Sequence, residues 1–312
     1  MKKYGFGVDV GGTTVKIGFF ESGGELVDKW EIPTNTDDHG KEILPDIAKA
    51  IDNKLAQEGI SKSDVEGVGI GVPGPVRGDG VVNGCVNLGW GVINVAEELG
   101  RMTGLRVKVG NDANVAALGE MWKGGGMGCP DVVMVTLGTG VGGGIIVDGH
   151  IVAGFNGAGG EIGHITVNND EIEPCNCGQY GCLEQYASAT GIVRMAKRKL
   201  AKSNEDTVLR KYTTLTAKDI FDEAKAGDAV ALALVDDLGE ILGSTLSNMA
   251  CVVNPEVFVI GGGVSKAGQI LIDTIQKHYV ETSFHACRET RFELASLGND
   301  AGMYGCMRLV LE

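Results

Sequence analysis

The chain alternates short apolar runs with glycine-rich turns and amphipathic stretches, a pattern typical of an α/β protein. Residues 4–10 and 65–72 consist of small and β-branched residues and predict buried strands. Residues 41–58 predict a helix because apolar side chains recur there at every fourth position: Ile43, Ile47, Ile51 and Leu55. We expect the other strands at 15–20, 25–32, 106–109, 131–137, 143–147, 150–153, 257–260 and 292–297, and another helix at 113–122.

The order of these elements repeats along the chain. A strand, a glycine turn and a second strand occur around residues 9–13 and again around 138–144. The sequence Gly-Asn-Asp-Ala occurs at 110–113 and at 298–301. We infer a duplicated α/β unit that forms two lobes with a cleft between them, and such clefts are preferred ligand sites. The polar residues 199–230 predict peripheral helices without a chemical motif.

Composition excludes two classes of protein. The 312 residues carry a net charge of -14, which argues against a general nucleic-acid surface. Apolar runs fall short of the ~20 residues that cross a membrane. We see no leader before the first strand and therefore expect a cytoplasmic protein in a reducing compartment. Fifty glycines against seven prolines indicate many places where bare backbone can approach a ligand.

One imidazole and three thiols form the most specific cluster. His164 is followed by Cys175, Cys177 and Cys182 in a C-x-C-x4-C run, the ligand types of a closed, structural tetrahedral zinc site. Glu161 and Glu184 flank the cluster, and the zinc does not need them, so we expect the metal to order a loop that presents both carboxylates. The remaining five cysteines are interpreted as small apolar fillers: Cys85, Cys129, Cys251, Cys287 and Cys306.

The two glycine turns are candidate phosphate cradles. Residues 138–144 match neither a P-loop nor a dinucleotide-binding fingerprint, but backbone amides there can bind phosphate oxygens. Residues 9–13 offer the same arrangement in the first half. Asp9 ends a buried strand, and we favour a role near Mg²⁺ and the phosphates over a turn cap. Lys16 is interpreted as a solvated strand residue.

Asp112 is the candidate base. It stands where a strand meets a helix, and it could accept the proton of an alcohol during phosphoryl transfer. The alternative is a helix N-cap, and Asp300 in the second half serves as the internal control. The short polar groups suit a ligand with several hydroxyls: Asn87, Asn111, Glu161, His164 and Glu184.

In combination these motifs resemble the ROK (repressor, open reading frame, kinase) family from end to end. The resemblance rests on Asp9-Val-Gly-Gly-Thr13, Gly71-Val-Pro-Gly-Pro75, Asn87-Leu-Gly-Trp90, Gly110-Asn-Asp112, Gly138-Thr-Gly140, Glu161-Ile-Gly-His164, the cysteine run and Gly298-Asn-Asp-Ala-Gly302. The chain looks most like the bacterial ATP-dependent glucokinases of that family. The implied fold is the ribonuclease H-like, actin-like ATPase fold, with domain closure over sugar and nucleotide.

The resemblance implies a role for each motif. It makes Asp112 the catalytic base, with sugar contacts from Asn87, Asn111, Asp112, Glu161, His164 and Glu184. It implies phosphate contacts from Gly11, Gly12, Thr13, Gly138, Thr139 and Gly140, and nucleotide contacts near Gly261, Gly262 and Gly263. It supports zinc at His164 and the three cysteines, ATP with Mg²⁺, and a homodimer. We expect a small domain at 1–112, joined by the helix 299–312, and a large domain at 113–298.

We weigh four alternatives to the phosphorylation of glucose by ATP. The hexose could be N-acetylmannosamine, N-acetylglucosamine, fructose, mannose or allose. A repressor is disfavoured because no segment precedes the first strand to hold a DNA-binding module. A non-catalytic sugar sensor is disfavoured because Asp112 and both glycine turns are present. Polyphosphate as donor is disfavoured because the glycine turns carry little Lys or Arg.

Overall fold

The computed structural model describes residues 2–312, which divide into two compact units. The first unit runs through Pro130 and includes residues 144–160 and 296–312, and the second comprises residues 131–143 and 161–295. This division places the helix after Asp112 in the first unit, whereas the sequence suggests a boundary before that helix. The domain limits 1–112 and 113–298 therefore stay a prediction.

The first unit is built on a five-stranded sheet with the order β3-β2-β1-β4-β7. Its strands are β1 (Tyr4–Val10), β2 (Thr14–Glu21), β3 (Leu26–Pro33), β4 (Val65–Val72) and β7 (Val107–Asn111). Strand β1 pairs antiparallel with β2 and parallel with β4, so the first glycine turn joins two neighbouring strands. A separate two-stranded sheet pairs β5 (Val81–Cys85) with β6 (Trp90–Asn94).

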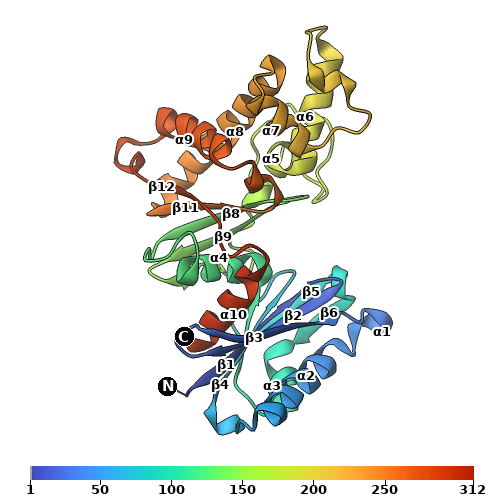
Figure 1. Ribbon diagram of the computed structural model, residues 1–312, viewed down its shortest axis with the longest axis vertical. Helices are drawn as coiled ribbons and strands as arrows, with labels where there is room; N and C mark the ends of the chain where they lie inside the picture. Colours follow the sequence, from blue (N-terminus) through green and yellow to red (C-terminus); the bar gives the residue numbers. More distant parts are fainter. Residues whose placement is uncertain (1) are drawn as a thin grey trace. The chain divides into compact units, whose positions relative to one another are not determined.

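Helices cover this sheet and complete the unit. The longer ones are α2 (Ile43–Glu58), α3 (Val95–Thr103), α4 (Asp112–Lys123) and α10 (Ala301–Leu311). The short elements are α1 (Asp37–Gly40), η1 (Lys62–Asp64), η2 (Val86–Leu88) and η7 (Gly298–Asp300). The periodic isoleucines of α2 are all buried, and this helix packs into one continuous core with β1 and β4. Figure 1 shows α10, at the red end of the chain, beside β1 and β4.

Helices α4 and α10 cross at bare backbone. A Cβ added to Gly119 would lie 2.1 Å from the carbonyl oxygen of Ala301. A Cβ added to Gly305 would lie 1.6 Å from the carbonyl oxygen of Val115. No side chain fits at either position, so the two glycines allow the helices to touch directly.

The second five-stranded sheet repeats the connectivity of the first, with the order β10-β9-β8-β11-β12. Its strands are β8 (Val132–Leu137), β9 (Val141–Val147), β10 (His150–Ile151), β11 (Val257–Gly261) and β12 (Arg291–Leu294). Strand β11 pairs parallel with β8 and β12, as β4 pairs with β1 and β7. The duplicated α/β fold expected from the sequence is therefore confirmed, although β10 and β12 end earlier than predicted.

The second unit contains five α-helices among the described residues. They are α5 (Glu184–Ala187), α6 (Ala189–Lys202), α7 (Ala217–Lys225), α8 (Ala229–Val253) and α9 (Gln269–Thr282). Short 3-10 segments are η3 (Ile162–His164), η4 (Val208–Lys211), η5 (Gly263–Ala267) and η6 (His285–Cys287). The helical prediction for residues 199–230 is confirmed. Among residues 2–312, no helix combines the length and the apolarity needed to span a bilayer.

Candidate functional site

Asp9 is the charged residue of strand β1 and lies half-buried beside the first glycine turn. Burial raises the pKa of Asp9 to about 6; the charge of Lys16 opposes this rise and the charge of Asp112 adds to it. A Cβ on Gly302, in the first turn of α10, would lie 2.7 Å from the Asp9 carboxyl carbon, so this glycine leaves room for the carboxylate. The turn itself closes when the Gly11 N–H donates to the Thr14 carbonyl at 3.0 Å.

Lys16 is a partly exposed strand residue, as predicted, but it also has partners that the sequence does not show. It faces Asp9 across the β1–β2 ladder, is half-buried, and its Nζ donates to the Asn299 carbonyl at 3.0 Å. Its attraction for the Asp9 carboxylate explains why it lowers the pKa of that group. The period-2 pattern of β2 places Lys16 between the buried residues Val15 and Ile17 but does not show what it faces.

Asn111 and Asp112 both lie at the start of α4, but their side chains make different hydrogen bonds. Asn111 is the N-cap: its Oδ1 accepts from the N–H groups of Ala113 and Asn114 at 3.0 and 3.2 Å. Its Nδ2 donates to the Gly74 carbonyl at 3.1 Å, which leaves one amide hydrogen for a ligand. Asp112 is exposed, and its Oδ1 accepts from the Ala113 N–H at 2.8 Å. The cap is thus supplied by Asn111, and the Asp112 carboxylate faces solvent.

The second Gly-Asn-Asp-Ala adopts another structure. Residues 298–300 form the 3-10 segment η7, and Asp300 makes no side-chain cap. Its carboxylate instead pairs with Lys29 Nζ at 2.6 Å. Both segments precede a helix, α4 or α10, but the first places Asp112 at the first helical position, whereas the second places Asp300 in a 3-10 turn beside Lys29.

The second glycine turn, at residues 138–140, is held by Glu184. Glu184 Oε2 accepts from the Val141 N–H at 3.0 Å. A Cβ on Gly140 would lie 2.2 Å from the same oxygen, so glycine is required for this approach. The turn is also tied to the start of α6, where Ala189 N–H donates to the Gly138 carbonyl and Thr190 Oγ1 to the Thr139 carbonyl. One carboxylate oxygen of Glu184 is therefore occupied by the turn.

His164, Cys175, Cys177 and Cys182 converge, as the spacing predicts. One ligand atom from each lies within 4.8 Å of the others. The sulfurs of Cys177 and Cys182 are 3.6 Å apart, and Cys175 Sγ lies 4.0 Å from His164 Nδ1. Ligands around zinc at ~2.3 Å are separated by roughly 3.8 Å in a tetrahedron, so these residues fit a tetrahedral ion. The Nδ1 atom faces the cluster, which leaves Nε2 of the exposed His164 for another partner.

The electrostatics of the thiols agree with a cation site. The backbone N–H of Gln179 lowers the pKa of Cys177 below its usual value, while burial raises the pKa of Cys182 to about 12. The raised pKa of Cys182 favours its neutral thiol when no cation is bound, and a bound cation would favour the thiolate form of all three cysteines. Of the five cysteines expected to be apolar fillers, four are buried, but Cys251 is exposed and that part of the prediction is wrong.

The six predicted sugar contacts divide between the two units. Asn87, Asn111 and Asp112 belong to the first unit, and Glu161, His164 and Glu184 to the second. Asn87 and Glu161 are exposed, which leaves both available to a ligand.

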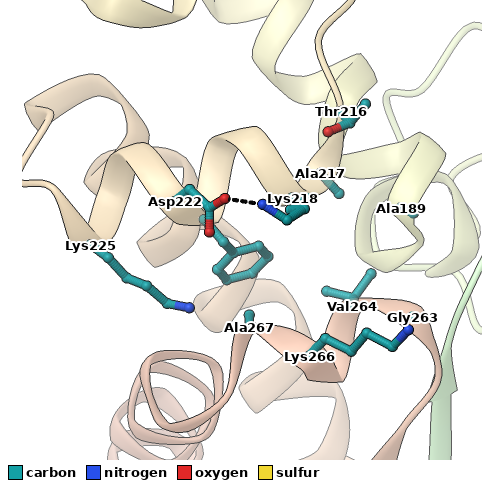
Figure 2. Close-up of a pocket in the computed structure, with 11 residues that line it drawn as sticks. Ala189, Thr216, Ala217, Lys218, Asp222, Lys225, Gly263, Val264, Lys266 and Ala267 are labelled. Carbon is teal, nitrogen blue, oxygen red and sulfur yellow. Dashed lines mark hydrogen bonds and ion pairs between the residues drawn. The ribbon is translucent and has the colours of Figure 1, made fainter.

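A cavity of about 300 Å³ lies in the second unit next to Gly263. In Figure 2, Ala217, Lys218 and Asp222 of α7 lie across from Val264 and Ala267 of η5. The complete lining is Ala189, Thr216, Ala217, Lys218, Phe221, Asp222, Lys225, Gly263, Val264, Lys266 and Ala267. Its walls are mainly apolar and include three lysines, Lys218, Lys225 and Lys266. This combination suits a flat apolar ring joined to an anionic group.

Of this lining, sequence reasoning identified only Gly263. The walls come from three segments that are far apart in the sequence, and a motif search has no signal for such a set. Glu120 and Glu171 were also missed. Glu120 is fully buried and its carboxylate accepts from the N–H groups of Gly125, Ser296 and Leu297 at 2.9, 3.0 and 2.9 Å.

Comparisons with known proteins agree with these motifs. The chain is 49% identical to the glucokinase of Halalkalibacterium halodurans over 304 residues, covering 96% of this chain and 92% of that one. It is 35% identical to the glucokinase of Thermotoga maritima, covering 98% and 96%. The structure of a ROK family glucokinase from Streptomyces griseus in complex with glucose and AMPPNP matches with a TM-score of 0.72, 34% identity and 98% coverage of both chains. The ROK family model matches residues 5–312, and the chain belongs to the ROK family.

Proposed function

We propose that this chain phosphorylates glucose on its 6-hydroxyl with Mg-ATP as donor. The observation that carries the proposal is the 49% identity with a glucokinase over nearly the whole of both chains. Related kinases for other hexoses share the fold and the mechanism, so the identity of the sugar is the part that an experiment must decide.

Asp112 is the proposed base. Its exposed carboxylate stands at the first position of α4, and its own helix holds it by the Ala113 N–H. Bound to the sugar hydroxyl, it would orient the oxygen and take its proton as the phosphoryl group transfers. The sugar would be held by the amide of Asn111, by Asn87, and by Glu161, His164 and Glu184 of the second unit.

The glycine turns at 11–13 and 138–140 would bind the phosphates through backbone N–H groups. The cavity beside Gly263 would receive the nucleotide base, with the neighbouring Gly261 and Gly262 as further nucleotide contacts. Mg²⁺ bound near Asp9 would neutralise charge on the phosphates. The raised pKa of Asp9 is consistent with this role, because a carboxylate whose charge is costly gains most from a cation.

Zinc at His164, Cys175, Cys177 and Cys182 would be structural. Four protein ligands leave no position for a reacting group, so its contribution is to order the loop between Glu161 and Glu184. We also propose that the enzyme is a cytoplasmic homodimer, which size-exclusion chromatography with light scattering would test.

The deciding experiment is a comparison of kcat/KM for ADP release with Mg-ATP across hexoses and N-acetylhexosamines. A clear preference for glucose supports the proposal. A preference for fructose, mannose, allose or an acetylated sugar keeps the mechanism and replaces the substrate. Sugar binding without any turnover identifies a non-catalytic sensor instead.

A further inference from the structure

Glu171 lies in the loop between His164 and Cys175, and the proposed chemistry does not use it. Its side chain is 1% exposed, yet it accepts six hydrogen bonds. Two come from the backbone N–H groups of Ile172 and Glu173, both at 3.0 Å. The other four come from side chains on α5 and α6. Together they hold its pKa well below the usual range, with the bonds from Arg198 contributing most.

The side-chain donors reach from the loop to two helices. Arg198 donates through both Nη atoms, at 2.8 and 2.9 Å, and Arg194 donates at 3.0 Å. Tyr186 Oη donates at 2.6 Å and accepts from Asn168 Nδ2 at 2.8 Å. The guanidinium of Arg194 also stacks over the Tyr186 ring at 5.2 Å. A bidentate arginine in a buried network allows little variation in geometry.

These helices also carry groups assigned to substrate. Tyr186 lies two residues after Glu184, in the same short helix α5. Helix α6 begins at Ala189, which lines the cavity beside Gly263. The residues before it, Glu184 and Ser188, are joined by a hydrogen bond of 2.6 Å, and the turn at 138–141 is bonded to Glu184, Ala189 and Thr190.

We propose that Glu171 is a positioning residue that locks the cysteine-bearing loop to α5 and α6 and thereby sets Glu184 and the phosphate turn for binding. The inference rests on the proposed function for what Glu184 and the turn bind. Because one carboxylate joins all three segments, its loss is expected to change ligand affinity at the turn and the stability of the cysteine loop together.

The chain offers two matched controls. Glu173 pairs with the same two arginines, at 3.2 and 2.8 Å, but its side chain is 56% exposed. Asp237, on α8, pairs with Lys199 at 2.9 Å. Lys199 lies on α6, more than one helical turn beyond Arg194. Exposed ion pairs of this kind contribute little. If the loss of any negative charge near the arginines were enough to change ligand affinity, Glu173→Gln would also change it. If any weakening of the contacts of α6 were enough, Asp237→Asn would change it.

The test compares Glu171→Gln with both controls and the wild type. The measurements are KM for glucose, kcat, the affinity for AMP-PNP, and the rate at which zinc passes to a chelator. We expect Glu171→Gln to raise KM and weaken AMP-PNP binding about tenfold, with faster zinc release, and the controls to stay within about twofold. A lower melting temperature with unchanged KM, AMP-PNP affinity and zinc release would show that Glu171 only stabilises the fold.

Two measures keep the outcome decisive. If Glu171→Gln does not fold, Tyr186→Phe removes one of the six hydrogen bonds and keeps the charge; about a threefold loss of AMP-PNP affinity supports the inference, and wild-type affinity refutes it. If the wild type does not phosphorylate glucose, the proposed function fails. Zinc release and AMP-PNP binding then still decide the role of Glu171, because neither requires turnover.

Discussion

Replacing Asp9 with asparagine should stabilise the protein while impairing its activity. Asp9 has a folded-state pKa of about 6 against 3.8 for an unperturbed aspartate, chiefly because of burial. The folded state therefore holds this proton more tightly than the unfolded state does. Protonated Asp9 therefore favours the folded state most at pH 4 and below, and this contribution to the free energy of unfolding is lost as the pH rises through 6.

The size of the effect follows from the shift. The difference between about 6 and 3.8 corresponds to a penalty of about 3 kcal/mol above pH 7, at 1.36 kcal/mol for each unit. Asparagine has nearly the same shape and no charge to desolvate. Asp9→Asn should accordingly be more stable than the wild type by up to about 3 kcal/mol at pH 8, and nearly equal to it near pH 4.

Urea unfolding at pH 4.5, 6 and 8 in EDTA would measure this difference. Asp300→Asn is the control, because it removes an exposed pair with Lys29 and should cost less than about 1 kcal/mol. Adding Mg²⁺ should narrow the gap at pH 8 by stabilising only the wild type. An Asp9→Asn protein that is no more stable than the wild type at pH 8 would refute the reasoning.

Four further outcomes are expected. Asp112→Asn should bind glucose normally and lose nearly all turnover, whereas Asp300→Asn should keep its kcat; the reverse ranking in a coupled ADP assay would show that the wrong aspartate was chosen. Cys177→Ser should lose zinc by elemental analysis and bind glucose more weakly, and a zinc-free variant with unchanged affinity would contradict the role of the loop. Glu120→Ala leaves three partly buried N–H groups unpaired and should lower the free energy of unfolding by about 3 kcal/mol, measured by urea titration, with Glu120→Gln less affected. Ala267→Phe should fill the cavity beside Gly263 and raise KM for ATP with little change in KM for glucose; equal effects on both would place the nucleotide base elsewhere.

Much of the fold follows from local pattern. Strand β1 is an apolar run that ends before a glycine turn, and helix α2 has one buried stripe, so both are visible in the order of residues. The cluster of His164 and three cysteines could also be predicted, because its four members lie within nineteen positions of the sequence. These features depend on neighbours in sequence, which is the information that periodicity and spacing contain.

The features that escaped prediction depend on distant partners. Glu120 accepts hydrogen bonds from Ser296 and Leu297, which lie more than 170 positions away in the sequence. The residues next to Glu120 in the sequence do not indicate these donors. Glu171 sits among polar residues that predict only a loop, although a carboxylate followed by two arginines spaced four apart on a helix is a usable signal. The two Gly-Asn-Asp-Ala segments show the opposite case, since identical letters form a capped helix start in one place and a 3-10 turn in the other.

The glycine crossing of α4 and α10 limits how this protein can vary. Asp112 opens α4, and Gly302 at the start of α10 leaves room for Asp9 of β1, so the surroundings of both carboxylates depend on two helices that meet at Gly119 and Gly305. Where main chain touches main chain, no combination of larger and smaller side chains can compensate for an added methyl group. A library that randomises the apolar core should yield many active clones, whereas one that randomises these two glycines should yield almost none. The placement of Asp9 and Asp112 thus depends on a contact between two main chains, and substitutions among the apolar core side chains should leave it unchanged.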